Sequence, residues 1–186
     1  VCCEVVNPLL EFSFNEMDVK TNSFANTFPG KDPKHNALDC DASKITGSRK
    51  CPEYRASGVS GGSVFFDGGA LPLQFISPED LGIQANLMTQ KPWSFTAWIR
   101  PQYRYCGANR YCRNPIMCGK YPPAKTSKGL CLDIVNGRAA VTVDGVVYTT
   151  PWKLPDMEWS HVAYVFDAAK DTGRTRVYVN GRESIL

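Results

Sequence analysis

The sequence predicts an all-β fold in which two antiparallel sheets form a sandwich. Short segments alternate apolar and polar residues, and turn-forming dipeptides separate strands at intervals of roughly 8–12 residues. The chain has no long amphipathic helix, no internal repeat and no apolar run long enough to span a membrane. Its 186 residues, 43% of them hydrophobic, suit a single domain over residues 1–186 with a sizeable core.

The N-terminal part of the chain carries weaker strand signals. "LLEFSF" (9–14) alternates and predicts a half-buried strand, whereas residues 15–61 predict a stapled loop or short strands. "GGSVFFDGG" predicts a short strand between glycine turns, and "LPLQFI" alternates again. In "SPEDLG", Ser77 before Pro78 is typical of a helix N-terminus and predicts one helical turn.

"WSFTAWIRP" is the clearest strand of the C-terminal part. Its alternation places Phe95, Ala97 and Ile99 on one face and Thr96 and Trp98 on the other. After residue 129 a meander follows, in which "GLCLDIV", "RAAVTV" and "VVYTT" are separated by Asn-Gly and Asp-Gly. These dipeptides are strong hairpin signals between alternating segments. "EWSHVAYVFD" and "RTRVYV" predict two more strands.

The tripeptide Asn-Gly-Arg occurs twice, at residues 136–138 and 180–182. It resembles a cell-adhesion motif. Both copies lie where a type I′ hairpin turn requires Asn-Gly, so we interpret them as turns.

One connection, residues 100–129, is strongly basic. It contains seven Lys or Arg, no Asp or Glu, four Tyr and three Cys, although the net charge of the whole chain is only +3. Arginine offers forked donors to sulfate or carboxylate, and tyrosine adds a rigid contact surface. We therefore interpret this insertion as a binding surface; a loop that only covers a sheet edge or a neighbouring domain is the alternative. The candidate ligand-binding residues are Arg100, Tyr103, Arg104, Tyr105, Arg110, Tyr111 and Arg113.

The eight cysteines indicate an oxidising compartment, hence a secreted or cell-surface protein. No C-x-x-C pair occurs, which argues against structural zinc, and the compartment argues against nucleic acid as a partner. Eight cysteines allow 105 pairings, and among these we expect Cys40–Cys51, Cys106–Cys112 and Cys118–Cys131. Cys2 and Cys3 then remain, and we expect one or both to tether a neighbouring domain or chain.

Four quoted segments together resemble a known family: "GGSVFFDGG", "WSFTAWIRP", "GLCLDIVNGRAAVTVDG" and "WSHVAYVFDAAKDTGRTRVYVNGRE". The pattern, over residues 62–186, is similar to the laminin-G-like group of the concanavalin A-like lectin/glucanase superfamily, and "NPLLEFSFNE" resembles its opening strand. The resemblance implies a jelly-roll sandwich and an extracellular module that binds proteins or glycans. The family usually continues for several more strands, so these are expected to come from elsewhere in a longer protein or from a second chain.

The sequence offers little for glycoside hydrolysis, for a Ser–His catalytic pair or for calcium binding. Glucanases use Glu-x-Asp-x-x-Glu, whereas this chain offers only Asp156 and Glu158 in "LPDMEWS". Ser160 and His161 are adjacent on a strand, so they face opposite ways and cannot form a catalytic pair. Calcium is possible, as in many laminin-G-like domains, but no ligand set has the spacing. The scattered acidic candidates are Asp39, Asp41, Asp67, Asp133, Asp144, Asp167 and Asp171.

The sequence thus predicts a non-catalytic extracellular recognition or adhesion module whose partner is an anionic glycan or a protein. A structural module of a larger cell-surface or extracellular assembly is the alternative, and a glycoside hydrolase is the third possibility.

Overall fold

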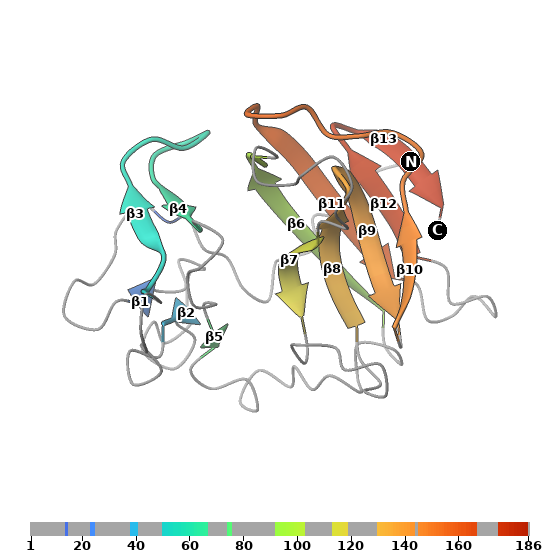
Figure 1. Ribbon diagram of the computed structural model, residues 1–186, viewed down its shortest axis with the longest axis horizontal. Coiled ribbons are helices and arrows are strands. Elements are labelled where there is room, and N and C mark those ends of the chain that lie inside the picture. The colour runs from blue at the N-terminus through green and yellow to red at the C-terminus, as the bar shows by residue number, and fades with distance from the viewer. Residues whose placement is uncertain are drawn as a thin grey trace, which may run out of the picture. The chain divides into compact units, whose positions relative to one another are not determined.

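The computed structural model consists of β-strands and connections (Figure 1). It describes residues 14, 23–24, 38–40, 50–66, 74–75, 92–102, 113–118, 130–143, 145–166 and 175–185. Within these residues the strands are β1 (Ser23–Phe24), β2 (Leu38–Asp39), β3 (Glu53–Arg55), β4 (Ser63–Phe65), β5 (Gln74–Phe75), β6 (Trp93–Ile99), β7 (Arg113–Cys118), β8 (Leu130–Val135), β9 (Arg138–Val143), β10 (Val146–Thr149), β11 (Ser160–Phe166), β12 (Thr175–Val179) and β13 (Arg182–Ile185). No helix long and apolar enough to cross a membrane occurs in this part of the chain.

The chain divides into two compact units, residues 1–83 and 84–186. The first contains a small antiparallel sheet in the order β1-β2-β5 and a hairpin of β3 and β4. In the hairpin, the guanidinium of Arg55 lies 3.8 Å from the ring centroid of Phe65. The disulfide Cys40–Cys51 crosslinks this unit, as the sequence predicts. The single domain expected over the whole chain stays a prediction.

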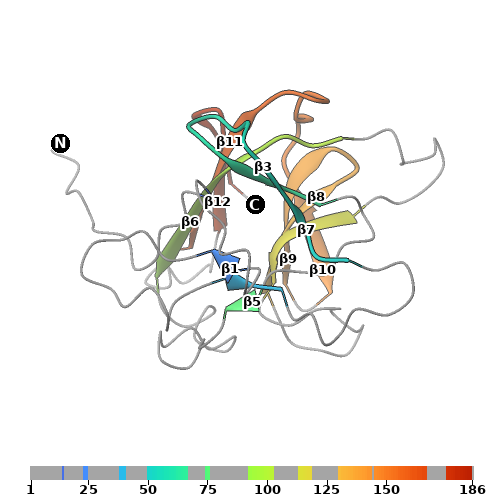
Figure 2. The same ribbon diagram turned by 90° about the vertical axis from the view of Figure 1, so that its left-hand side faces the viewer.

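The second unit is a two-sheet sandwich, which confirms the predicted fold class. One sheet has the order β10-β9-β8-β7 and is called the β8 sheet; the other has the order β13-β12-β11-β6 and is called the β6 sheet. All their neighbouring strands are antiparallel. Figure 2 shows the two sheets as separate layers. The chain passes from the β6 sheet to the β8 sheet between β6 and β7, and it returns between β10 and β11.

The core lies between these two sheets. It consists of alternate residues of β8, β9, β11 and β12 together with Leu154 from the connection before β11. In β6, Phe95, Ala97 and Ile99 pack against this cluster while Trp98 is exposed, so the predicted face assignment is confirmed. The buried members are Leu130, Leu132, Ile134, Ala139, Val141, Leu154, Val162, Tyr164, Val177 and Val179.

Two tight turns have the geometry that the sequence predicts. Asn136 and Gly137 have φ of 49° and 79°, and Asn180 and Gly181 have φ of 51° and 79°. Positive φ at both central positions defines the type I′ turn and explains why Asn-Gly occupies them. The first turn joins β8 to β9, and the second joins β12 to β13.

One strand of the sandwich, β7, was not predicted. It lies inside the segment that the sequence analysis treats as a basic insertion, and Pro115 stands in its middle. Proline cannot donate to a sheet ladder and is confined to edges and bulges. Both conditions hold, because β7 is at the edge of the described β8 sheet and its register shifts between Pro115 and Met117.

Other predicted elements lie partly or wholly outside the described residues. Within "LPLQFI" the described residues 74 and 75 form β5, and the irregular N-terminal part contains short strands, as expected. The strand expected at "LLEFSF" is described only at Phe14, which is not in a strand. The helical turn at "SPEDLG" lies outside the described residues.

Candidate functional site

The basic segment 100–129 is described at its entrance, residues 100–102, and along β7. Five of its seven predicted binding residues lie outside the described part of the chain: Tyr103, Arg104, Tyr105, Arg110 and Tyr111. The other two, Arg100 and Arg113, are described in full. Each makes a specific contact with the sandwich.

Arg100 ties the entrance of the segment to the connection before β11. Its Nε donates to the carbonyl oxygen of Met157 at 2.7 Å, and the N–H of Met157 donates to the carbonyl oxygen of Pro101 at 2.9 Å. Met157 has φ of +61°, a left-handed conformation that is uncommon for a residue with a side chain. Both backbone polar groups of Met157 are thus used to hold residues 100 and 101.

Arg113 begins β7 and forms an ion pair with Asp133 on the neighbouring strand β8. Its Nη2 lies 2.8 Å from Asp133 Oδ2, and Thr142 Oγ1 donates to the same oxygen at 2.7 Å. The Asp133 side chain is 0% exposed and that of Arg113 20%. In the strand register Arg113 pairs with Val135, two residues after Asp133, and Thr142 pairs with Cys131, two residues before it. The two donors therefore approach the carboxylate diagonally from the two flanking strands.

The buried ion pair fixes the start of β7 within the basic segment. A carboxylate without solvent is stable only when it is paired and hydrogen-bonded, and removal of its partner is strongly destabilising. Within the described residues Asp133 Oδ1 and Arg113 Nε have no hydrogen-bond partner, so the pair depends on Oδ2 alone. An acidic residue inside the apolar run "GLCLDIV" was the sequence signal for such a pair.

Tyr164 lies on β11 at the centre of the core, and it contacts the backbone of β8 at Asp133. Its hydroxyl donates to the carbonyl oxygen of Asp133 at 3.2 Å. Burial raises the pKa of Tyr164 above its ordinary value, and the negative charge of Asp133 raises it further, while a backbone hydrogen bond at Ala140 acts in the opposite direction. The phenol therefore stays neutral over the physiological pH range.

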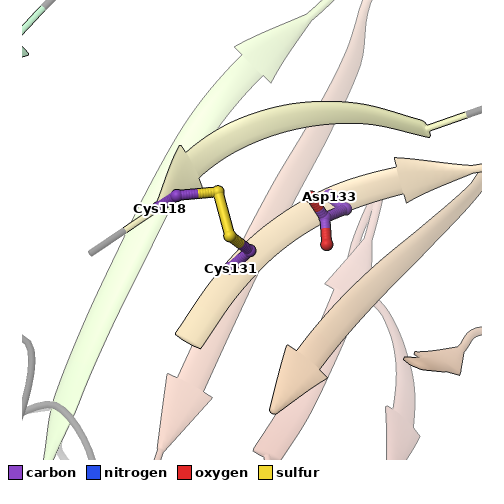
Figure 3. Close-up of side chains that lie close together, drawn as sticks. All are labelled: Cys118, Cys131 and Asp133. Atoms are coloured by element: carbon purple, nitrogen blue, oxygen red, sulfur yellow. A yellow bond between two sulfur atoms is a disulfide. The ribbon is translucent and has the colours of Figure 1, made fainter. Parts of the chain in front are cut away.

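Cys118, Cys131 and Asp133 form the cluster of potential metal ligands in the described residues. Their ligand atoms all lie within 4.8 Å of one another. Figure 3 shows, however, that the two sulfur atoms are bonded to each other, with Asp133 further along β8. A disulfide offers no thiolate, so only one carboxylate remains and the cluster does not suit a metal ion. Its role is a crosslink between the paired residues of β7 and β8.

The disulfide predictions are confirmed where the structure describes the cysteines. Cys40–Cys51 and Cys118–Cys131 are both formed. The predicted pair Cys106–Cys112 and the tether at Cys2 and Cys3 lie outside the described residues.

Many laminin-G-like domains bind calcium, and among the acidic candidates the structure describes the side chain of Asp133 alone. Asp133 does not suit a calcium ligand, because its carboxylate already faces the guanidinium of Arg113. The side chains of the other acidic candidates are outside the described part of the chain. The expectation that the chain has no cofactor, with calcium as the less favoured alternative, therefore stays a prediction.

The residues weighed as catalytic have the arrangement expected from the sequence. Asp156 and Glu158 are exposed in the connection before β11. Ser160 is fully buried and His161 is half-buried, since neighbours on a strand face opposite ways. Ser160 and His161 therefore do not form the pair that nucleophilic catalysis requires.

The side chains of both Asn-Gly-Arg copies have contacts within the sandwich. Arg138 Nη1 donates to the carbonyl oxygens of Thr150 and Pro151, and the guanidinium of Arg182 lies 4.0 Å from the ring centroid of Trp152. Asn180 accepts a hydrogen bond from the N–H of His161 through Oδ1. These contacts support the interpretation as turns.

Trp98 forms an exposed aromatic surface that the sequence analysis did not select. It is 53% exposed on the side of β6 that faces away from the core. Its ring lies beside that of His161 on β11, with 5.2 Å between centroids and 59° between planes. The alternation in "WSFTAWIRP" had already placed Trp98 outside, and an outward Trp two residues before an Arg was the available signal.

A model of a laminin-G family in the concanavalin A-like lectin/glucanases superfamily matches residues 79–184. The chain belongs to this superfamily. Its laminin-G-like members are commonly non-catalytic binding modules, although the superfamily also includes glycosidases. Searches of curated proteins and of solved structures found no match. The match ends within β13 and includes the whole basic segment.

Proposed function

We propose that this chain is an extracellular, non-catalytic recognition module whose basic segment 100–129 binds an anionic ligand. The membership of the superfamily supports a binding module, and the two disulfides support an oxidising compartment. The ligand chemistry follows from the seven basic and no acidic residues of the segment, which favour sulfate or carboxylate groups.

One observation carries the proposal: the residues on either side of the stretch 103–112 are fixed to the sandwich by arginine. Arg100 binds the backbone at Met157, and Arg113 binds the buried Asp133. Arg113 is committed to the sandwich, whereas Arg100 uses only its Nε, so the cations between the two arginines and the terminal nitrogens of Arg100 are left to meet a ligand. A connection with fixed ends loses less conformational entropy on binding than a free loop does.

The anchoring also changes which residues should be mutated. Arg113 stabilises β7, because its removal would leave Asp133 buried without its cation. Arg104 and Arg110 are the arginines of the segment between the two anchors, so they are the residues to replace in a binding test.

The test is binding of heparin by isothermal titration calorimetry across a range of salt concentrations. We expect binding that weakens steeply with salt, and a double variant, Arg104→Ala with Arg110→Ala, that binds more weakly with a shallower salt dependence. The matched control replaces two exposed arginines elsewhere, Arg55→Ala with Arg176→Ala, and should bind like the parent. Absence of heparin binding at low salt, or equal binding by the two double variants, would contradict the proposal and favour a purely structural module.

A further inference from the structure

We infer that the outer face of the β6 sheet around Trp98 is a stacking platform for a sugar ring whose acidic substituent is held at Arg100. This inference rests on the proposed function, because it takes the ligand of the basic segment to be anionic. It goes further in specifying that the ligand is an acidic glycan, recognised through the ring of the sugar as well as through its charge.

Trp98 supplies a large apolar surface that is turned toward solvent. The same strand has Trp93, Phe95, Ala97 and Ile99 for the core, so the exposure of Trp98 follows from its position in the alternation. An indole of which 53% is exposed offers a flat face with negative π density. Such a face suits the C–H surface of a sugar ring, which is apolar and carries partial positive charge.

The platform is held in place before any ligand binds. The His161 ring packs against Trp98 at 5.2 Å. The backbone of His161 is itself fixed twice by Asn180, whose Oδ1 accepts from the His161 N–H at 2.8 Å and whose N–H donates to the His161 carbonyl at 2.9 Å. Preorganisation of this kind lowers the entropy lost on binding.

The row of side chains beside the platform leaves room for a ring. In the register of the β6 sheet, Trp98 pairs with His161, and the next row consists of Thr96, Ala163, Tyr178 and, at the far edge of the sheet, Glu183. Thr96 and Ala163 are short, so the indole stands above its neighbours on that side. The hydroxyl groups of Thr96 and Tyr178 offer hydrogen bonds to sugar hydroxyls.

Arg100 provides the charge next to the platform. The alternation of half-buried and exposed residues along β6 continues to Arg100, two positions after Trp98 and roughly 6.8 Å further along an extended chain. Its Nε is used by Met157, and its two terminal nitrogens have no partner within the described residues, so they can bind a carboxylate or sulfate. Asp156, Glu158 and Glu183 oppose an anion, but segment 100–129 has six basic residues besides Arg113, whose charge is paired with Asp133.

A glycan fits this surface better than an acidic protein does. Protein hot spots around Trp lie in closely packed apolar surroundings that exclude water. Here the neighbours of Trp98 on the outer face include Thr96, Arg100 and the half-buried His161, which are polar. A single exposed ring among hydrogen-bonding groups is the arrangement that recognises a sugar.

The experiment compares two polyanions, a heparin hexasaccharide and poly-glutamate, which share charge but differ in the sugar ring. We expect Trp98→Ala to weaken hexasaccharide binding about tenfold, in line with the loss of one aromatic stacking contact, and to leave poly-glutamate binding unchanged within about twofold. Trp98→Phe should retain most of the affinity. Tyr148→Ala is the matched control, since Tyr148 is an aromatic residue 46% exposed on β10 of the other sheet, and it should bind both probes like the parent.

Direct observation of the ring gives a second readout that does not depend on the folding of a variant. The indole N–H signal of Trp98, assigned by its loss in Trp98→Phe, should shift in the NMR spectrum when hexasaccharide is added and not when poly-glutamate is added. Equal weakening of both probes by Trp98→Ala would overturn the inference in favour of a protein surface. An unshifted indole signal together with unchanged hexasaccharide affinity would overturn it while leaving the proposed function to the Arg104 and Arg110 variants, which test it separately.

Discussion

Replacement of Arg113 by Met is predicted to destabilise the sandwich far more than the loss of a surface ion pair. The substitution keeps an unbranched side chain of similar length and removes the charge that faces Asp133 Oδ2 at 2.8 Å. Asp133 is 0% exposed, so its carboxylate cannot turn toward water, and Thr142 remains as its described donor. A buried charge that loses its partner costs about 3–5 kcal/mol of unfolding free energy.

Replacing Asp133 should cost less stability than replacing Arg113. The double variant should show whether the unpaired buried charge is the cause of the larger loss. In Asp133→Asn, the guanidinium of Arg113 can reach solvent because it is 20% exposed, and the amide oxygen still accepts from Thr142, so we expect a loss of about 1–2 kcal/mol. The double variant Arg113→Met with Asp133→Asn contains no buried charge. It should therefore be more stable than Arg113→Met alone by about 2 kcal/mol.

Urea unfolding followed by far-ultraviolet circular dichroism, with the disulfides intact, measures these differences. Arg176→Met is the control: its ion pair with Glu183 is 3.8 Å long and exposed, and its loss should cost less than about 1 kcal/mol. The reasoning is refuted if Arg113→Met behaves like Arg176→Met, or if the double variant is destabilised by the sum of its two single substitutions.

Two further predictions concern the core and the crosslink. Because the pKa of Tyr164 is raised in the folded state, its contribution is fully present below the unfolded value of 10.0 and is lost as pH rises toward the folded value. Between pH 9 and 11 we expect the parent to lose stability more steeply than Tyr164→Phe, by up to about 1.4 kcal/mol per pH unit, in urea unfolding at each pH, and parallel curves would contradict it. Replacing Cys118 and Cys131 together by Ala removes a crosslink between residues 13 apart and should cost about 3 kcal/mol of unfolding free energy in the same assay, whereas a loss below about 1 kcal/mol would show that strand pairing alone holds β7.

The parts of the fold that were predicted from the sequence depend on local chemistry. Alternation along "WSFTAWIRP" is sufficient to assign the two faces of β6, because successive side chains of a strand point to opposite sides. Asn-Gly at 136–137 and 180–181 is sufficient to place two hairpin turns, because both central residues need positive φ. Neither inference requires knowledge of a distant residue.

The missed strand β7 depends on a neighbour. Pro115 argues against a strand when "RNPIMC" is considered alone. In the structure the segment pairs with β8, the register shift after Pro115 absorbs the missing donor, and Cys118 joins its paired residue Cys131. This pairing joins residues far apart in the chain, so local propensity does not reveal it.

The same limit applies to the candidate site. Charge and tyrosine content identify segment 100–129, but they do not tell which arginines bind a ligand and which bind the protein. The partners of Arg100 and Arg113 lie 57 and 20 residues further along the chain. Those separations explain why the sequence does not reveal that both arginines also contact the sandwich.

Substitutions at the anchor formed by Arg113 and Asp133 and substitutions of Arg104 and Arg110 should change heparin binding in different ways. Arg113 and Asp133 form a neutral pair, so replacing both by Met and Asn leaves the net charge of the chain unchanged. Any effect of that double variant on heparin affinity must then come from a less well held segment, and the dependence on salt should keep the slope of the parent. Loss of Arg104 and Arg110 removes two charges and should reduce the slope itself. Affinity alone does not separate the two effects, whereas the salt dependence does, because only contacts with the anion displace counterions.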